Sequence, residues 1–234
     1  MGNLTDFRAD MLRAKVYSRT YEDLRTDSAI VIGERLMLHD SIKADYDIRQ
    51  DVLEILQDAY RMEKDYEQAL HWALQLSDLF REHDMQTALL RNDAEIGAFM
   101  IRIGQQKEGL AKIDSVIHVL HGQRHFFEMD ATIIALKRKA EVCNEIGLYA
   151  EIIPAAQQIL ELLNDYEQHP DEFRDINDTG RVISDEERPR YIDFYRSKAY
   201  AYMAMAYSLI PDPSPRGEGG GLPKRQRFSG KTIP

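Results

Sequence analysis

The sequence contains 234 residues, of which 44% are hydrophobic and 30% are charged, with a formal net charge of −10. This composition excludes an intrinsically disordered chain and predicts one domain, or one short repeat array, with a hydrophobic core. Residues 211–234 carry five basic and two acidic side chains, so residues 1–210 hold a net charge of −13. Such an acidic body repels phosphate backbones, and we expect no nucleic-acid binding by the main domain.

The cysteine content and the hydropathy pattern bear on location. The single cysteine, Cys143, can form no disulfide within the chain, which fits a reducing compartment. No run of 18 apolar residues occurs, and the opening residues MGNLTDFRADMLRAK lack the apolar segment of a signal peptide. We therefore expect a cytoplasmic protein that does not enter the membrane. An export signal upstream of Met1 stays an open alternative.

Apolar residues spaced three and four apart predict a series of helices separated by short polar breaks. No window alternates apolar and polar residues, so no strand is expected. In chain order the expected elements are two helices within 4–38, helices around 52–60 and 69–80 with a break at Lys64-Asp65, helices 87–103 and 110–120 with a break at Gly104, and helices 130–146 and 152–163 with a break at Gly147.

Proline and glycine positions predict where the fold ends. Five of the eight prolines and five of the thirteen glycines lie within residues 211–234. We expect a helical domain over residues 1–210, with an insertion near 165–187, and a disordered basic tail over 211–234. The tail's cluster of Lys224, Arg225 and Arg227 fits a solvated segment better than a nucleic-acid or membrane arm, because so short a basic run is usually solvated.

The helix pairs overlay on one another. Leu56 and Tyr60 on a first helix, followed by Ala69 and Ala73 on a second, resemble the tetratricopeptide repeat (TPR) pattern of small and aromatic residues. Weaker copies surround Met100, Cys143 and Tyr207, and their wider spacing resembles the extended-helix arrays of bacterial regulators. The resemblance implies a right-handed α-α superhelix in which these four positions are equivalent buried sites: Tyr60, Met100, Cys143 and Tyr207.

The resemblance also implies a partner-binding groove lined by the first helix of each pair. Its mixed charges suit an extended peptide or a helix held by directed hydrogen bonds and ion pairs, although an ordinary solvated face is an equal alternative for any one residue. Taking the core positions as inward-facing, we expect the groove to carry Asp51, Glu54, Asp58, Arg61, Arg91, Glu95, Ala98, Arg102, Lys137, Arg138, Glu141 and Asn144.

A calcium loop is the main alternative, within the expected insertion. Asp175, Asn177, Thr179 and Glu186 match ligand positions of the twelve-residue calcium loop. The same segment also fits a polar turn followed by a capping box, in which Ser184 and Glu187 bond to each other at the start of the next helix. Flanking prolines and the absence of a second loop favour the turn, so a calcium- or metal-dependent sensor or enzyme is the lesser alternative.

Other candidate chemistry is weaker. His118, His121 and His125 have helical spacing, but Gly122 predicts a helix end between them, so we expect a polar helix terminus and not a metal site. Cys143 lies at a core position and is expected to be an inert buried thiol. No nucleophile, phosphate-loop or dinucleotide motif occurs, so we expect neither enzymatic activity nor a cofactor.

These observations predict a TPR-like scaffold or sensor module of a bacterial regulator that binds a protein or peptide. The last first-type helix, which contains Tyr207, has no second helix expected after it. Its uncapped apolar flank predicts self-association into a homo-oligomer. The sequence leaves open the identity of the partner, whether the natural chain continues into an effector domain, and whether the present chain is a remnant without a function of its own.

Overall fold

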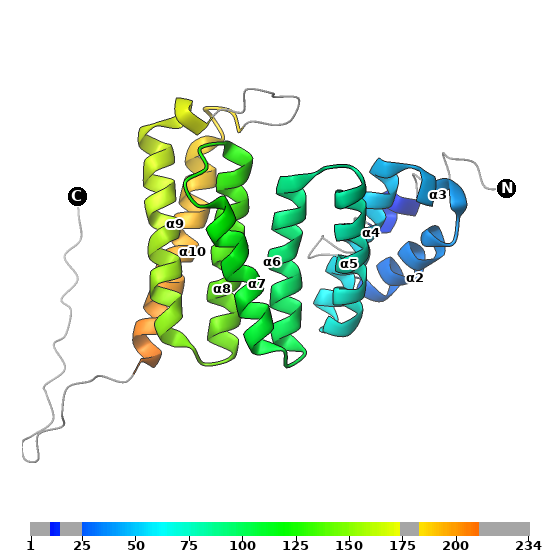
Figure 1. Ribbon diagram of the computed structural model, residues 1–234, viewed down its shortest axis with the longest axis horizontal. Helices are drawn as coiled ribbons and strands as arrows, with labels where there is room; N and C mark the ends of the chain where they lie inside the picture. Colours follow the sequence, from blue (N-terminus) through cyan, green and yellow to red (C-terminus); the bar gives the residue numbers. More distant parts are fainter. Residues whose placement is uncertain (1–9, 15–24, 174–182, 211–234) are drawn as a thin grey trace, which may run out of the picture.

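The computed structural model describes residues 10–14, 25–173 and 183–210, and every regular element in these ranges is helical (Figure 1). The all-α prediction is therefore confirmed. Residues 10–14 form one short helical segment. The elements that follow are α2 (Thr26–Met37), α3 (Asp40–Ala44), α4 (Tyr46–Met62), α5 (Tyr66–Glu82), α6 (Gln86–Arg102), α7 (Gln106–Leu120), α8 (Phe126–Glu145), α9 (Tyr149–Gln168), the 3-10 helix η1 (Pro170–Phe173) and α10 (Arg188–Leu209).

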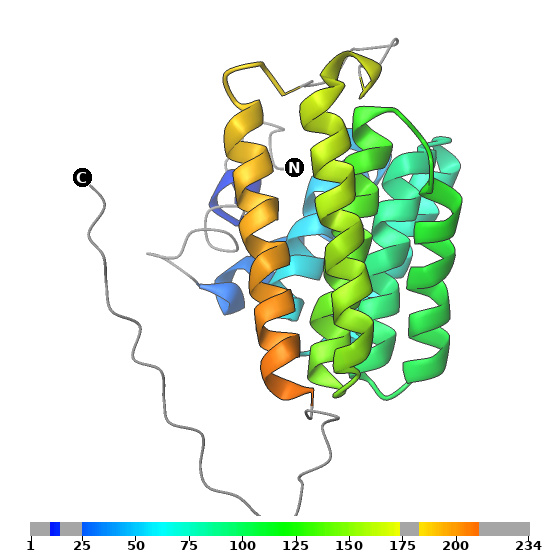
Figure 2. The same cartoon turned by 90° about the vertical axis from the view of Figure 1, so that its left-hand side faces the viewer.

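Consecutive helices pack as neighbours: α4 with α5, α6 with α7, and α8 with α9. Three residues connect the two helices of each pair, and such short connections make the two helices antiparallel. Between pairs, α5 packs on α6, and both α6 and α7 pack on α8. At the C-terminal end of the row, α10 packs on α9 and, less extensively, on α8 (Figures 1 and 2).

The first helix of each pair ends in the same backbone motif. An amide donates to the carbonyl five residues earlier, and the residue just before the donor has a left-handed backbone, with φ of 63° at Lys64, 95° at Gly104 and 77° at Gly147. This is the C-terminal cap that glycine favours, because glycine has no Cβ to clash. The amide–carbonyl pairs are Asp65–Tyr60 (3.0 Å), Gln105–Met100 (2.8 Å) and Leu148–Cys143 (2.8 Å).

Three of the four positions predicted to be equivalent therefore occupy the same place relative to their helix ends. Cys143 is fully buried, whereas Tyr60 and Met100 are half-buried. The prediction of burial is wrong for Tyr207, whose side chain is 60% exposed. The reason is helix rotation: α10 buries its alanine face, and the fully buried Ala206 takes the place against α9 that the repeat pattern gives to Tyr207.

Two glycines allow α6 and α7 to approach each other closely. A Cβ built on Gly109 of α7 would lie 2.5 Å from the carbonyl oxygen of Gly97 in α6, and one built on Gly97 would lie 2.7 Å from the side chain of Ile113. Such separations leave no room for a methyl group, so α6 and α7 approach backbone to backbone. This pair then forms the support on which α8 packs.

Buried and capping polar groups fix the ends and seams of α4, α5 and α6. Asp45 and Asp65 precede α4 and α5, and each carboxylate accepts a hydrogen bond of 3.1 Å from a first-turn amide. Between α5 and α6, the buried amide of Asn92 donates to the carbonyl oxygen of Ala73 (2.7 Å) and to Oγ of Ser77 (2.9 Å). Because both hydrogen bonds of this buried amide depend on the relative position of α5 and α6, they favour one packing arrangement of the two helices.

Within the described residues, none of the helices combines the length and the apolar character needed to cross a lipid bilayer.

Candidate functional site

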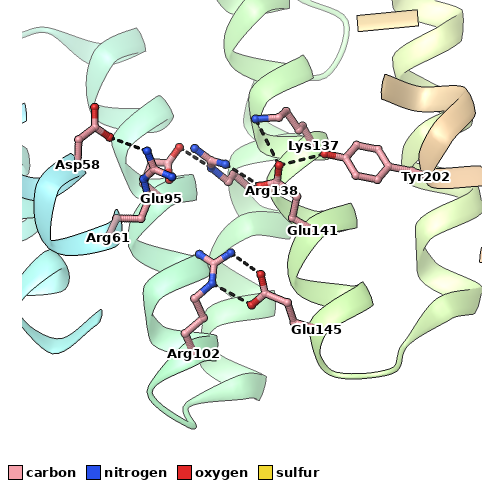
Figure 3. A network of polar contacts seen from close by, with 9 residues as sticks. All are labelled: Asp58, Arg61, Glu95, Arg102, Lys137, Arg138, Glu141, Glu145 and Tyr202. Atoms are coloured by element: carbon pink, nitrogen blue, oxygen red, sulfur yellow. Dashed lines mark hydrogen bonds and ion pairs between the residues drawn. The ribbon is translucent and has the colours of Figure 1, made fainter. Parts of the chain in front are cut away.

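Polar side chains from α4, α6, α8 and α10 gather on one face of the molecule, which we call the first-helix face (Figure 3). It contains most of the charged residues that the sequence predicted for a groove. The structure shows that many of them pair with one another across helix seams. Those that belong to this face and are drawn in Figure 3 are Asp58, Arg61, Glu95, Arg102, Lys137, Arg138, Glu141 and Glu145, together with Tyr202.

Arg138 of α8 is the centre of this network. Its Nε donates to Glu95 of α6 at 2.6 Å, and its Nη1 donates to Glu141, one turn along α8, at 2.6 Å. The side chains of Arg138 and Glu95 are only 15% and 14% exposed. Burial acts to lower the pKa of Arg138, but the two carboxylates outweigh it and the pKa is raised. The guanidinium therefore stays charged and ties α6 to α8.

A second link between the same helices is formed by Arg102 and Glu145. The guanidinium binds the carboxylate through two parallel hydrogen bonds, 2.9 Å from Nε and 2.7 Å from Nη2. The Arg102 side chain is 10% exposed and also lies over the ring of Tyr66, 5.1 Å from its centroid. Bidentate geometry and the aromatic contact fix the side chain, so Arg102 is poorly placed to bind a separate ligand.

Tyrosines of α10 extend the network to the end of the row. The hydroxyl of Tyr202 donates to Glu141 at 3.0 Å, and that of Tyr191 donates to Asp130 at 2.8 Å. Burial first, and then the neighbouring carboxylate, raises the pKa of each tyrosine, so both hydroxyls remain protonated donors. Burial acts to raise the pKa of Glu141, but its neighbouring cations, Arg138 above all, outweigh this effect and lower it.

The α4 part of the face is less constrained. Arg61 lies 3.2 Å from Asp58 on its own helix, with both side chains 31% exposed. The side-chain amide of Gln50 donates to Glu54 at 3.0 Å. Asp51 is half-buried on the same helix. In contrast to α6 and α8, Arg61 makes its ion pair within one helix, so its position is less constrained by packing.

Exposure divides the charged residues of the first-helix face into two groups. We call Glu95, Arg102 and Arg138 the floor, because their side chains are at most 15% exposed. We call Arg61, Arg91 and Glu145 the rim, with side chains 31%, 57% and 43% exposed. Arg91 is the most accessible, and its contact with Asp130 is a long one of 3.5 Å. Floor residues hold α6 and α8 together, whereas the side chains of the rim residues are partly or largely accessible to solvent.

The sequence prediction of this face was wrong at one position and incomplete at others. Ala98 is fully buried among residues of α6, α7 and α8, because α8 packs closely on this part of α6. Asn144 is half-buried on α8. Asp130 and Glu145 were missed, although they lie eight residues before and seven residues after Arg138, which puts them on the same helix face. No pattern in the sequence indicated that the tyrosines of α10 would donate hydrogen bonds to residues of this face.

The calcium-loop motif lies mostly outside the described residues, namely Asp175, Asn177 and Thr179. Its last position, Glu186, is exposed in the turn before α10. The two reciprocal contacts of the competing prediction, a capping box, are present, but they lie in the turn before α10, whose N-cap residue Glu187 has no side-chain cap hydrogen bond. The amide of Glu187 donates to Oγ of Ser184, and the amide of Ser184 donates to the Glu187 carboxylate, both at 3.3 Å.

The histidine series is interrupted as predicted. α7 ends at Leu120, Gly122 has a left-handed backbone with φ of 79°, and His125 precedes the first residue of α8. His118 and His125 therefore belong to different helices. Within residues 10–14, 25–173 and 183–210, no three His, Cys, Asp or Glu side chains are grouped closely enough to hold a metal ion.

Cys143 is fully buried, and burial raises the pKa of its thiol from 9.0 to about 11. At pH 8 the native protein should therefore react with a disulfide reagent such as DTNB roughly 100-fold more slowly than an ordinary thiol, because so little thiolate is present. Urea unfolding should restore the ordinary rate, and equal rates in the two states would contradict the prediction.

The raised pKa of Cys143 also affects stability. Because the folded chain holds this proton more tightly than the unfolded chain does, the free energy of unfolding falls as the pH rises from 9 to 11.

Two cavities lie away from the first-helix face. One, of about 310 Å³, lies between α7, α8 and α9, with Leu120, Leu162 and Asp165 in its lining. The other, of about 640 Å³, is open and lies beside α2, α3 and α5, with Leu38 and Trp72 in its lining. Polar side chains also line both cavities, among them His121, Gln158 and Glu161 in the first and Glu34, Arg35 and Lys43 in the second.

Comparisons with known proteins give no match. No protein-family model matches the chain, no curated protein does, and no solved structure does. The geometry of the first-helix face and the repeat pattern of the sequence are therefore the two grounds on which a function can be argued.

Proposed function

We propose that this chain is a non-enzymatic, TPR-like helical repeat scaffold that holds a protein or peptide partner against its first-helix face. Three features support the proposal. The sequence repeats the small and aromatic residues of the tetratricopeptide pattern, consecutive helices form antiparallel pairs, and the first helices of three pairs end in one backbone motif. In such arrays the first helices line the inner side of the superhelix, where partners are usually bound.

The observation that carries the proposal is the division between floor and rim. The Glu95–Arg138 pair joins α6 to α8, so we expect the face to need little reorganisation when a partner binds. The rim arginines lie on two different helices, with the Arg91 side chain 57% exposed and the Arg61 side chain 31% exposed. An extended segment or a helix that carries carboxylates can bridge them through charge-assisted hydrogen bonds, and the remaining contacts supply complementarity.

Rim substitutions test this proposal. A peptide-display library selected on the wild-type chain supplies ligands, whose affinities are then measured by calorimetry. Arg61→Ala and Arg91→Ala should each weaken the selected ligands about tenfold, which corresponds to about 1.4 kcal/mol. The melting temperature should change little, because Arg91 is largely exposed and Arg61 makes its ion pair within a single helix.

The matched control is Arg81→Ala. Arg81 pairs with Asp78 on α5, three residues earlier, in the same way that Arg61 pairs with Asp58 on α4. This substitution should leave ligand affinity unchanged. Equal losses from Arg81→Ala and Arg61→Ala, or no loss from either rim variant, would contradict binding at the first-helix face. A melting temperature raised by calcium and lowered again by EDTA would instead favour the calcium-loop alternative.

A further inference from the structure

One side of α10 is uncovered and carries large aromatic side chains beside small and charged ones. Phe194, Tyr200 and Tyr207 are 51%, 56% and 60% exposed. α10 packs on α9 and α8 through its other side, and Figure 2 shows it at the end of the row beside α9. Large aromatic side chains exposed together on one helix are unusual unless another surface covers them.

Small residues run between these aromatic side chains. Ser197, Ala201, Ala204 and Ser208 are all exposed and follow one another at intervals of four, three and four residues, which places them along one line of the helix. Tyr200 lies to one side of this line. A line of small residues beside large ones allows a second helix to approach closely and to place its side chains between them.

We propose that this side of α10 binds the same side of α10 in a second copy of the chain, with the two helices antiparallel about a two-fold axis near Ala201. Within the described residues, α7 and α9 cover α6 and α8, whereas the helices that pack on α10, namely α9 and α8, leave this side of it open. A second copy presents a helix of the required length and pattern. The surface used differs from the first-helix face, so this inference does not depend on the proposed function.

The antiparallel register matches large residues with small ones. With the axis near Ala201, Phe194 of one copy faces Ser208 of the other, and the two Tyr200 rings lie about 3 Å apart along the axis. Tyr207 faces Asp193 of the second copy and can donate a hydrogen bond to its carboxylate. The contact therefore combines aromatic packing with a polar contact at each end.

Charge favours the antiparallel over the parallel arrangement. Asp193 and Lys198 are both exposed on this side of α10. A parallel pair would place Lys198 against Lys198 and Asp193 against Asp193, and such like-charge contacts are unfavourable. In the antiparallel pair the two Lys198 positions are about 9 Å apart along the axis, and the two Asp193 positions about 24 Å. The pattern of charges thus selects one orientation of two identical helices.

Size predicts a reversible dimer. α10 has 22 residues and is about 33 Å long, so one helix from each copy buries an area near the lower limit of ~1,200 Å² for stable complexes. We therefore expect dissociation in the micromolar range. Sedimentation equilibrium of the full chain from low micromolar to submillimolar concentration should show a shift from the monomer mass of 27.1 kDa to twice that value.

The first test places a charge on the axis. Ala201→Glu should raise the dimer dissociation constant at least about tenfold, because two carboxylates would then face each other. Ala111→Glu, at an exposed alanine in the middle of α7, is the matched control and should leave dimerisation unchanged. Circular dichroism checks that both variants fold, since neither alanine is buried. A chain that stays monomeric at submillimolar concentration, or a dimer unaffected by Ala201→Glu, overturns the proposal.

The second test determines the register by disulfide formation. Ala201→Cys should cross-link to itself under mild oxidation, whereas Ser208→Cys alone should not, because its two copies are about 21 Å apart along the axis. Mixing Ser208→Cys with Phe194→Cys should restore the cross-link. Cys143 is buried and is present in every variant, so it provides a constant background. Self-cross-linking of Ser208→Cys would indicate a parallel pair and overturn the proposed register.

Discussion

Replacing Arg138 with alanine is expected to lower the free energy of unfolding by about 3 kcal/mol. The substitution leaves Glu95 and Glu141 without their guanidinium partner, and Glu95 is only 14% exposed. Removing one member of a buried ion pair costs more than the pair contributes, because the remaining charge stays desolvated. Urea unfolding followed by circular dichroism measures the loss, with the slope of the transition used to check that unfolding remains two-state.

Two variants separate this effect from a general loss of charge. Arg124→Ala removes an arginine that also pairs with two carboxylates, Asp165 and Glu172, but whose side chain is 48% exposed, so we expect a much smaller loss than from Arg138→Ala. Combining Glu95→Gln with Arg138→Ala should recover part of the stability, because it removes the unpaired buried charge. Equal losses from Arg138→Ala and Arg124→Ala would contradict a buried floor.

The same variant should change how stability depends on acid. The folded chain holds the pKa of Glu141 below 4.5, chiefly because Arg138 outweighs the effect of burial. A lowered pKa contributes stability above the unfolded value, and this contribution is lost as the pH falls through the folded value. In the wild-type chain, the stability supplied by Glu141 should therefore decline below pH 4.5. The difference between wild type and Arg138→Ala should shrink over the same range.

Replacing Gly109 with alanine is expected to cost about 2–4 kcal/mol, even though alanine favours the helix by about 1 kcal/mol. The new Cβ would lie 2.5 Å from the carbonyl oxygen of Gly97 and 3.0 Å from the amide nitrogen of Ile101. Both atoms belong to the backbone of α6, so relief requires the two helices to separate. We expect a lower urea midpoint, and hydrogen exchange should show the largest loss of protection in α6 and α7.

Gly33→Ala provides the matched control within another helix. Its Cβ would lie 2.7 Å from Cδ2 and 2.8 Å from Cγ of Leu56, which is fully buried but whose side chain can shift more easily than a backbone. We therefore expect a smaller loss of stability than from Gly109→Ala. A neutral Gly109→Ala variant would show that α6 and α7 do not cross as closely as their backbones indicate.

The helices and their ends could be predicted because their causes are local. Apolar residues at intervals of three and four specify each helix. Gly104, Gly122 and Gly147 mark helix ends, because each adopts the left-handed backbone that a C-terminal cap requires and that glycine favours. The N-terminal region was less clear. α3 has only five residues and was not predicted, because a helix of little more than one turn has no measurable periodicity.

The candidate site could be predicted only in part. Helical spacing within each helix, together with the repeat resemblance, predicted that Glu95, Arg102 and Arg138 share one face, and the structure brings all three together on it. The spacing did not show that these charges pair with each other, because pairing depends on the distance between α6 and α8. Nor did it show that Tyr202 and Tyr191 of α10 donate to α8, since those contacts join residues 61 positions apart in the chain.

The sequence by itself determined that this protein is helical, where most of its helices begin and end, and which side of each helix is apolar, because these properties depend on residues within a few turns of one another. Only the tertiary structure decided how far each helix is rotated and how closely it approaches its neighbours. That rotation exposes Tyr207 and buries Ala98, and that approach depends on the glycine contact between α6 and α7. Packing decides both the rotation and the approach of the helices, because side chains that are far apart in the sequence must fill the space between helices without overlap.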